Sequence, residues 1–231
     1  MNLNKLEKDI ISIIDHGIKN LKSFNTKSDN SIVTNADIEI ENTLINYIKN
    51  SFPGIKIISE ENFNSHSEKY KLENKFAIID PIDGTENFLF LENIYGSAVS
   101  IVYAKLNYHL IYIPSENKKI STLTSEINKI TNSKINLYST SCLNQISDNQ
   151  DKQSCRIFGS STFMFYTLLS GNAKSYKYCK GAKIWDYYTG VSLALNSDLE
   201  LKVKLDGEYL NEIPTNINHR SKFEIINHGI K

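Results

Sequence analysis

Carboxylate side chains follow two short apolar runs of this sequence. Glu60 and Glu61 come directly after one run, and Asp80 and Asp83 come after another. A buried strand that stops on a carboxylate places the charge at the end of a sheet, where layered α/β folds have their ligand crevices. Carboxylates gathered in one crevice repel each other, so they need cations to share the space. Oxygen ligands favour magnesium, manganese or calcium over zinc. The pattern therefore predicts a site for hard divalent cations.

The most specific string is Asp-Pro-Ile-Asp-Gly-Thr at residues 80–85. Pro81 fixes one backbone angle, so the two aspartates can converge on neighbouring ions. Gly84 permits a close approach of the backbone, and the amides of Gly84 and Thr85 suit phosphate oxygens, as at a helix N-terminus. The Thr85 hydroxyl is placed to orient a water. The alternative is an ordinary Asx-type turn in which Asp83 and Thr85 only cap a helix. The glutamate pair after the other strand favours the site.

Hydrophobic periodicity predicts the elements that must position these groups. Apolar residues at helical spacing predict helices at 3–21, 36–50, 162–170 and 185–195, with Thr34 or Asn35 as the N-cap of the second. The continuous apolar run 76–79 predicts a strand buried on both faces, interrupted at once by Asp80. Further strands are expected at 55–58, 98–103, 108–113, 119–123, 135–138, 174–178, 199–205 and 223–226. Together these indicate layered α and β structure with a mixed sheet in each half.

Composition excludes several classes of function. The formal net charge is zero, so no overall field draws the chain to nucleic acid or to an anionic membrane. No uncharged apolar stretch approaches the roughly 18 residues of a membrane span, and the charged N-terminus reads as an amphipathic helix, not a signal peptide. Cys142, Cys155 and Cys179 are odd in number and irregularly spaced, which argues against a disulfide framework. Free thiols favour a reducing compartment, so we expect a cytoplasmic protein.

Several blocks of this sequence resemble the inositol monophosphatase family, part of a lithium-sensitive, magnesium-dependent phosphatase superfamily. Four blocks match in the family's order, and a weaker fifth resembles a Gly-Ser-Ala segment before a helix; they are 32–37, 57–61, 80–88, 184–186 with Gly190, and 159–161. The resemblance implies an α+β fold with layers αβαβα and mixed sheets between the helix layers. It also implies a single domain over 1–231. The N-terminal half, about 1–120, would hold most metal ligands, and the half from about 121 to 231 would add Asp186 and substrate contacts.

The resemblance further implies a role for each matching residue. Two or three magnesium ions are expected: the first on Glu60, Asp80 and the carbonyl of Ile82, and the second on Asp80, Asp83 and Asp186. Catalytic roles fall to Glu60, Thr85 and Asp37, with Asp37 bonded to Thr85 and Thr85 orienting water together with Glu60. Contacts to a small phosphorylated substrate would come from Gly84, Thr85, Asp83, Ser160 and Asp186. Glu61 would lie beside the cluster without binding metal.

Departures from the family pattern leave the substrate open. Cys179 stands where inositol enzymes carry a hydroxyl-binding glutamate, and Tyr187 and Tyr188 replace small residues close to Asp186. Lys27 is either the counterpart of a family lysine or a solvated surface lysine. The first reading is hydrolysis of an inositol or sugar monophosphate. A 3'(2'),5'-bisphosphate nucleotidase and a non-catalytic binding or regulatory protein are the alternatives, and a homodimer is left open.

Overall fold

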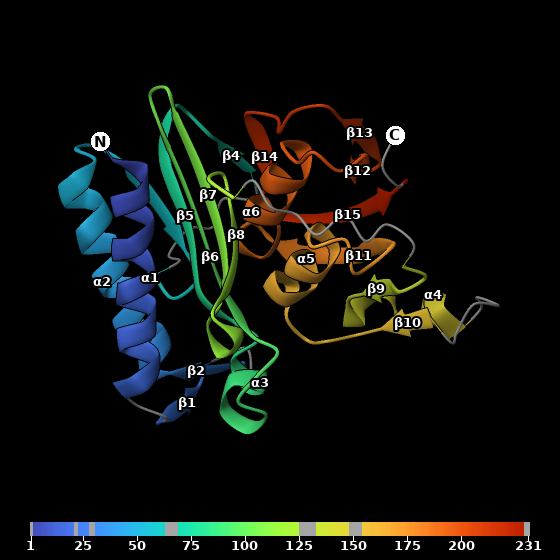
Figure 1. Cartoon of the computed structure of the whole chain (residues 1–231), viewed down its shortest axis with the longest axis horizontal. Helices are drawn as coiled ribbons and strands as arrows, with labels where there is room; N and C mark the ends of the chain where they lie inside the picture. Colours follow the sequence, from blue (N-terminus) through green and yellow to red (C-terminus); the bar gives the residue numbers. More distant parts are fainter. Residues whose placement is uncertain are drawn as a thin grey trace.

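The computed structural model describes residues 2–20, 23–27, 31–62, 69–124, 133–147 and 154–228. Helices α1 (Leu3–Asn20) and α2 (Asn35–Ser51) cover one face of a five-stranded sheet. Helices α5 (Ser161–Leu169) and α6 (Ile184–Leu195) lie between that sheet and a six-stranded one (Figure 1). The predicted alternation of helix and sheet layers is therefore confirmed.

The first helix layer places Asp37. In α2, Ile40, Leu44 and Ile48 are fully buried, as their helical spacing predicts. Thr34 is the N-cap, because its side chain accepts from the Asp37 amide at 3.2 Å while the Asp37 carboxylate accepts from the Thr34 amide at 2.8 Å. This reciprocal capping box fixes the start of the helix and holds Asp37 in one orientation.

The five-stranded sheet carries the Asp-Pro-Ile-Asp string. Its order is β3-β5-β6-β7-β8, and only β3 and β5 pair in parallel. The strands are β3 (Lys56–Ser59), β5 (Lys75–Asp83), β6 (Gly96–Tyr103), β7 (Leu106–Ile113) and β8 (Lys118–Ser121). The expectation that the strand stops before Asp80 was wrong, since β5 continues to Asp83 with an irregularity between the two aspartates. Pairing with β6 resumes at Asp83, and Ser97 Oγ donates to the Pro81 carbonyl at 2.5 Å.

The six-stranded sheet is also mixed, as predicted. Its order is β10-β9-β11-β15-β12-β13; β11 pairs in parallel with β9 and antiparallel with β15. The strands are β9 (Asn136–Tyr138), β10 (Cys155–Arg156), β11 (Ser175–Lys183), β12 (Leu201–Leu205), β13 (Glu208–Leu210) and β15 (Arg220–Asn227). β11 leads directly into α6, so the sheet sets the position of the first turn of that helix, where Asp186 lies.

Short elements complete the described chain. They are β1 (Phe24–Thr26), β2 (Ile32–Thr34), β4 (Lys69–Lys71), α3 (Thr85–Phe90), the 3-10 helices η1 (Pro114–Glu116) and η2 (Thr140–Cys142), α4 (Leu143–Ser147) and β14 (Asn216–Asn218). Much of the polar stretch 125–155, for which the sequence predicts little, lies outside the described residues. None of the described helices combines the length and hydropathy needed to cross a membrane.

The tyrosines expected near Asp186 pack into the core instead. Tyr187 is fully buried, and its hydroxyl donates to the Asn218 carbonyl at 2.6 Å. Tyr188 packs edge-on against Phe76, with ring centroids 5.6 Å apart. The two tyrosines thus find room in the core and do not line the cavity beside Asp186, because successive residues of a helix point in different directions. Trp185 is also buried in the core.

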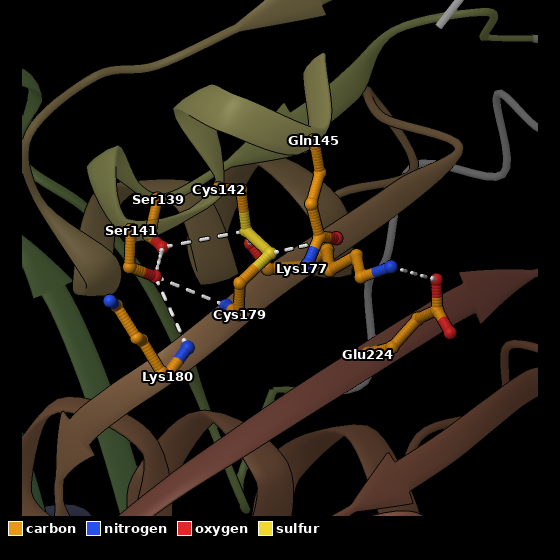
Figure 2. The surroundings of a disulfide bond; sticks show 8 residues. All are labelled: Ser139, Ser141, Cys142, Gln145, Lys177, Cys179, Lys180 and Glu224. Carbon is orange, nitrogen blue, oxygen red and sulfur yellow. Dashed lines mark hydrogen bonds and ion pairs between the residues drawn. A yellow bond between two sulfur atoms is a disulfide. The ribbon is translucent and has the colours of Figure 1, made fainter. Parts of the chain in front are cut away.

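A disulfide joins Cys142 of η2 to Cys179 of β11, with Cα atoms 5.1 Å apart (Figure 2). The expectation of free thiols was wrong for this pair and holds only for Cys155. The η2 turn lies against β11, where the Ser139 amide donates to the Lys177 carbonyl at 3.0 Å. Three cysteines cannot all pair with one another, but an odd number does not exclude a single disulfide. The argument for a reducing compartment and a cytoplasmic location thereby loses its support.

We expect Cys142→Ser to lower the free energy of unfolding by about 2–4 kcal/mol, because the bridge spans 37 residues and restricts the unfolded chain. Cys155→Ser is the matched control, since it removes the cysteine outside the bridge and should leave the disulfide intact. Urea unfolding of both variants, with and without a phosphine reductant, measures the effect. Equal midpoints for wild type and Cys142→Ser without reductant would contradict the bridge.

Candidate metal centre and active site

Three aspartates converge where β5 ends and α6 begins. Asp80, Asp83 and Asp186 each offer a carboxylate oxygen within 4.8 Å of the others. The irregularity in β5 lets both of its aspartates reach one side of the sheet. Asp186 lies in the first turn of α6, where its Oδ2 accepts from the Lys183 amide at 2.8 Å. The sequence prediction that these three side chains come together is consistent with this geometry.

Asp80 has the environment of a cation ligand. It is 1 % exposed, and neither carboxylate oxygen has a hydrogen-bond partner in the described part of the chain. Burial raises its pKa well above the ordinary range, and the charges of Glu60, Asp83 and Asp186 raise it further. A buried carboxylate without donors is costly, and buried polar groups are almost always satisfied. A divalent cation would supply the partner that this carboxylate lacks.

The other two aspartates are held by donors on one side only. Asp83 Oδ2 accepts from Ser160 Oγ at 2.9 Å and from the Thr162 amide, which leaves Oδ1 available. Burial raises the pKa of Asp83 to about 6 despite these bonds. Burial and the neighbouring charge of Asp83 likewise raise the pKa of Asp186. The donors at Oδ2 therefore fix the orientation of each of these two carboxylates.

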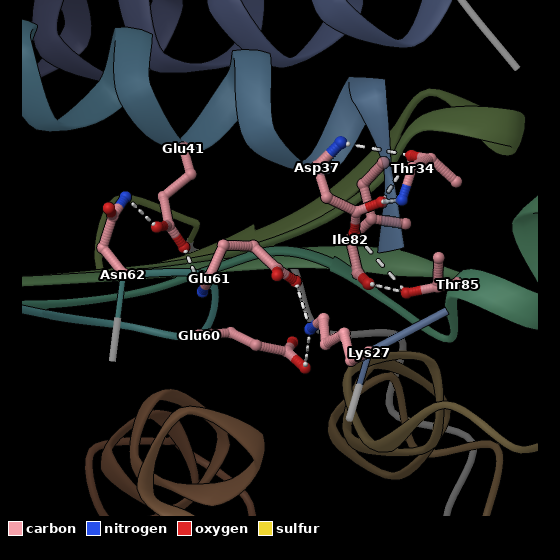
Figure 3. A network of polar contacts seen from close by, with 9 residues as sticks. All are labelled: Lys27, Thr34, Asp37, Glu41, Glu60, Glu61, Asn62, Ile82 and Thr85. Atoms are coloured by element: carbon pink, nitrogen blue, oxygen red, sulfur yellow. Dashed lines mark hydrogen bonds and ion pairs between the residues drawn. The ribbon is translucent and has the colours of Figure 1, made fainter. Parts of the chain in front are cut away.

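Lys27 forms ion pairs with both Glu60 and Glu61. Its Nζ lies 2.7 Å from Glu61 Oε1 and 3.4 Å from Glu60 Oε1 (Figure 3). This contact contradicts the reading of Lys27 as a solvated surface lysine. The Glu61 amide donates to Glu41 Oε2 at 2.8 Å, and burial together with the Glu60 charge raises the pKa of Glu61 to about 7. Glu60 lies outside the group of three aspartates, although its charge raises the pKa of Asp80.

Thr85 and Asp37 form the expected pair (Figure 3). Thr85 Oγ1 lies 3.4 Å from Asp37 Oδ1 and 3.2 Å from the Ile82 carbonyl oxygen. Asp37 is fully buried, and burial raises its pKa to about 6. Its Oδ2 is taken by the backbone and hydroxyl of Thr34. The Thr85 oxygen is thus held beside the Ile82 carbonyl, which the family resemblance implies to be a metal ligand.

Gly84 permits α3 to begin against α5. Its φ is +88°, and a Cβ there would lie 2.9 Å from Ser160 Cβ. Such a left-handed and crowded position favours glycine. Ser160 in turn caps α5, accepting from the Phe163 amide at 3.1 Å. The Ser160 hydroxyl also donates to Asp83, which connects the N-cap of α5 to the carboxylate cluster.

A small polar cavity of about 130 Å³ opens beside the carboxylates. It is lined by Asp83, Ser139, Thr140, Gly159, Ser160, Ser161, Met164, Tyr178 and Asp186. Tyr178 lines this cavity, whereas the expected specificity residue Cys179 is bridged to Cys142 and lines a different one. Sequence reasoning missed Ser139, Thr140 and Tyr178. Neighbouring residues of a strand face opposite sides of the sheet. Only this alternation along β11 could have indicated that Tyr178, and not Cys179, lines the cavity.

Residues 3–149 match the model of the inositol monophosphatase family. The chain belongs to the inositol monophosphatase family. Among curated relatives, inositol-1-monophosphatase of Bacillus subtilis (strain 168) is 40% identical over 77 residues, 33% of this chain and 28% of the relative. Human inositol monophosphatase 1 is 34% identical over 110 residues, covering 46% of this chain and 39% of the relative. The 3'(2'),5'-bisphosphate nucleotidase CysQ of Haemophilus influenzae is 32% identical over 76 residues, covering 33% and 28%. These matches span about a third of the relatives' lengths.

Solved structures extend the likeness to the whole fold. A staphylococcal inositol monophosphatase-1 in a lithium-soaked complex has a TM-score of 0.78 at 21% identity, covering 99% of this chain and 90% of that chain. A structure of an inositol monophosphatase/NADP phosphatase with Mg²⁺ and phosphate has a TM-score of 0.77 at 20% identity, covering 99% and 91%. The expected inositol monophosphatase-like fold is therefore confirmed.

Proposed function

We propose that this chain is a magnesium-dependent phosphatase that hydrolyses a small phosphate monoester. The observation that carries the proposal is the unpartnered, buried carboxylate of Asp80 between two further aspartates. Family membership supports it, and a related fold is known with Mg²⁺ and phosphate bound. Oxygen-only donors of this kind suit Mg²⁺.

The arrangement of the carboxylates and the family resemblance together support one assignment of the metal ligands. Asp80, Asp83 and Asp186 would hold one ion, and Asp80 would share a second with Glu60 and the Ile82 carbonyl. Magnesium, when bound, lowers the pKa of a coordinated water and neutralises charge on the transferred group. Lys27 must release Glu60 for the second set to form, because its ammonium now lies within ion-pair distance of that carboxylate.

Residues of the chain then position the reacting groups. Thr85, held between Asp37 and the Ile82 carbonyl, would orient the attacking water together with Glu60. Asp37 can accept a hydrogen bond from the Thr85 hydroxyl, which leaves the Thr85 oxygen able to accept a hydrogen bond from that water. The Ser161 amide at the start of α5 would bind a phosphate oxygen in the small cavity, with Gly84 allowing the backbone to approach. Ser160 would join it once its hydroxyl turns away from Asp83, to which it now donates. No side chain need become phosphorylated.

An inositol or sugar monophosphate is the first substrate class. The likeness to the bacterial and human inositol monophosphatases supports it. The likeness to CysQ supports a 3'(2'),5'-bisphosphate nucleotide as the second. Tyr178 of β11 lines the cavity, whereas Cys179, which stands where inositol enzymes carry a hydroxyl-binding glutamate, does not. We therefore expect weaker selection among substrate hydroxyls. A non-catalytic binding protein is the remaining alternative.

The test is magnesium-dependent phosphate release from inositol 1-phosphate, a hexose phosphate and a 3'-phosphorylated nucleotide on one preparation. We expect kcat/KM values for the first two within about a hundredfold of each other, a difference of less than about 2.7 kcal/mol. Asp83→Asn is the inactive control, because it keeps the shape of the side chain but removes a ligand charge. Absence of release from all three at saturating magnesium would favour the non-catalytic alternative.

A further inference from the structure

A second and larger cavity, of about 470 Å³, lies at the opposite ends of β5 and α6 from the metal centre. It opens between the start of β5, the turn from β6 to β7, the C-terminal end of α6 and residues 211–215. None of the residues assigned to metal or phosphate lines it. Its volume is that of a small-molecule site.

A buried histidine lines this cavity. His109 is 2 % exposed, and its Nδ1 lies 2.8 Å from Ser100 Oγ. Ser100 Oγ lies 2.8 Å from Thr189 Oγ1 on α6. Burial lowers the pKa of His109 to about 4, so the ring is neutral at ordinary pH. The other ring nitrogen, Nε2, has no hydrogen-bond partner within the described part of the chain.

The direction of this hydrogen-bond chain fixes which ring nitrogen of His109 carries the proton, and the contacts themselves permit both directions. Each hydroxyl has one proton to donate. If Thr189 donates to Ser100 and Ser100 donates to His109 Nδ1, both hydroxyl protons are used. In the reverse direction the Thr189 proton has no acceptor in this chain of contacts. The first arrangement places the proton on Nε2, which then offers a donor without an acceptor of its own.

Aromatic rings surround this donor. Phe76 and Tyr188 line the cavity and meet edge-on, and the His109 ring lies 6.1 Å from Tyr188 between centroids. Flat walls of this kind accommodate a planar ring. The side chains of Leu72, Leu106 and Leu195 extend the apolar lining.

The remaining lining residues are rich in amides and poor in positive charge. Four asparagines line the cavity: Asn74, Asn107, Asn196 and Asn211. Amides can both donate and accept, which suits the mixed edge of a nucleobase. The charged residues are Glu73, Glu212 and Lys105, so the cavity has one more acid than base and disfavours a phosphate. We propose that this cavity binds an uncharged nucleoside, with a ring acceptor on His109 Nε2 and the face of the base against the aromatic side chains.

Calorimetric titration of the metal-free protein with adenosine, guanosine, cytidine and uridine tests the proposal without any enzymatic readout. At least one nucleoside should bind with a Kd below about 1 mM, while ribose and inorganic phosphate should not compete with it. Failure of all four to bind at about 5 mM would overturn the proposal and leave the phosphatase assignment untouched.

Two variants locate the binding. His109→Phe keeps a ring but removes the donor, and should weaken binding by about tenfold or more. Because His109 is buried, Asn211→Trp provides a second test, since it fills the exposed mouth without touching the core. Asn50→Trp, an exposed asparagine on α2, is the matched control and should bind as wild type does. Binding that survives Asn211→Trp unchanged would place the nucleoside elsewhere and refute the assignment.

Discussion

We expect Asp80→Asn to remove magnesium-dependent phosphate release while raising the melting temperature of the metal-free protein. The carboxylate is buried without donors and close to three other acids, so its charge destabilises the fold when no cation is bound. The amide keeps the shape and removes the charge. Activity should fall by at least about a hundredfold. The melting temperature should rise by about 2–4 °C, which corresponds to roughly 1 kcal/mol.

Opposite signs for activity and stability distinguish a metal ligand from a structural residue. Asp198→Asn, an exposed acid with no part in the site, is the control and should change neither quantity. Differential scanning fluorimetry in EDTA and phosphate release in magnesium measure the two effects. A variant that is less stable than wild type in EDTA would show that Asp80 has a stabilising role that the geometry does not reveal.

Magnesium should stabilise the protein strongly at pH 8 and weakly at pH 5. Burial raises the pKa values of Asp37 and Asp83 to about 6 and that of Glu61 to about 7. A raised acid pKa means that the folded state binds more protons than the unfolded state between about pH 4 and 7. The metal-free fold therefore loses stability as pH rises through this window. Magnesium offsets this loss only where the carboxylates are ionised.

The difference in melting temperature with and without magnesium measures this linkage at each pH. At pH 8 we expect a shift about 5–10 °C larger than at pH 5, on the order of 2–3 kcal/mol. His109 acts in the opposite direction, since its lowered pKa destabilises the fold in acid. That contribution cancels in the difference, because it is present in both samples. A magnesium shift that does not vary with pH would contradict a site made of these acids.

Local patterns predicted much of the fold and the centre of the site. The N-cap at Thr34 and the buried stripe of α2 depend on residues close together in sequence and on strong periodicity. The convergence of Asp186 with Asp80 and Asp83 was expected from the family resemblance. The link between Asp37 and Thr85 came from the family resemblance and is present at 3.4 Å.

Features that depend on tertiary pairing were not predictable in this way. β5 runs through Pro81 because β6 continues to pair with it beyond the irregularity, and no local signal encodes that partner. The bridge between Cys142 and Cys179 requires η2 to lie on β11, 37 residues away. Tyr188 could be placed only once the faces of α6 were known. The ion pairs of Lys27 likewise join segments more than thirty residues apart.

Anomalous diffraction from crystals soaked in manganese tests the central claim most directly, because it locates metal without reference to turnover. The account predicts an anomalous peak bounded by Asp80, Asp83 and Asp186, and a second beside Glu60 and the Ile82 carbonyl with Lys27 displaced from Glu60. Asp80→Asn crystals under the same soak should lose both peaks. Manganese bound elsewhere, with the three aspartates free of metal at saturating concentration, would contradict the account.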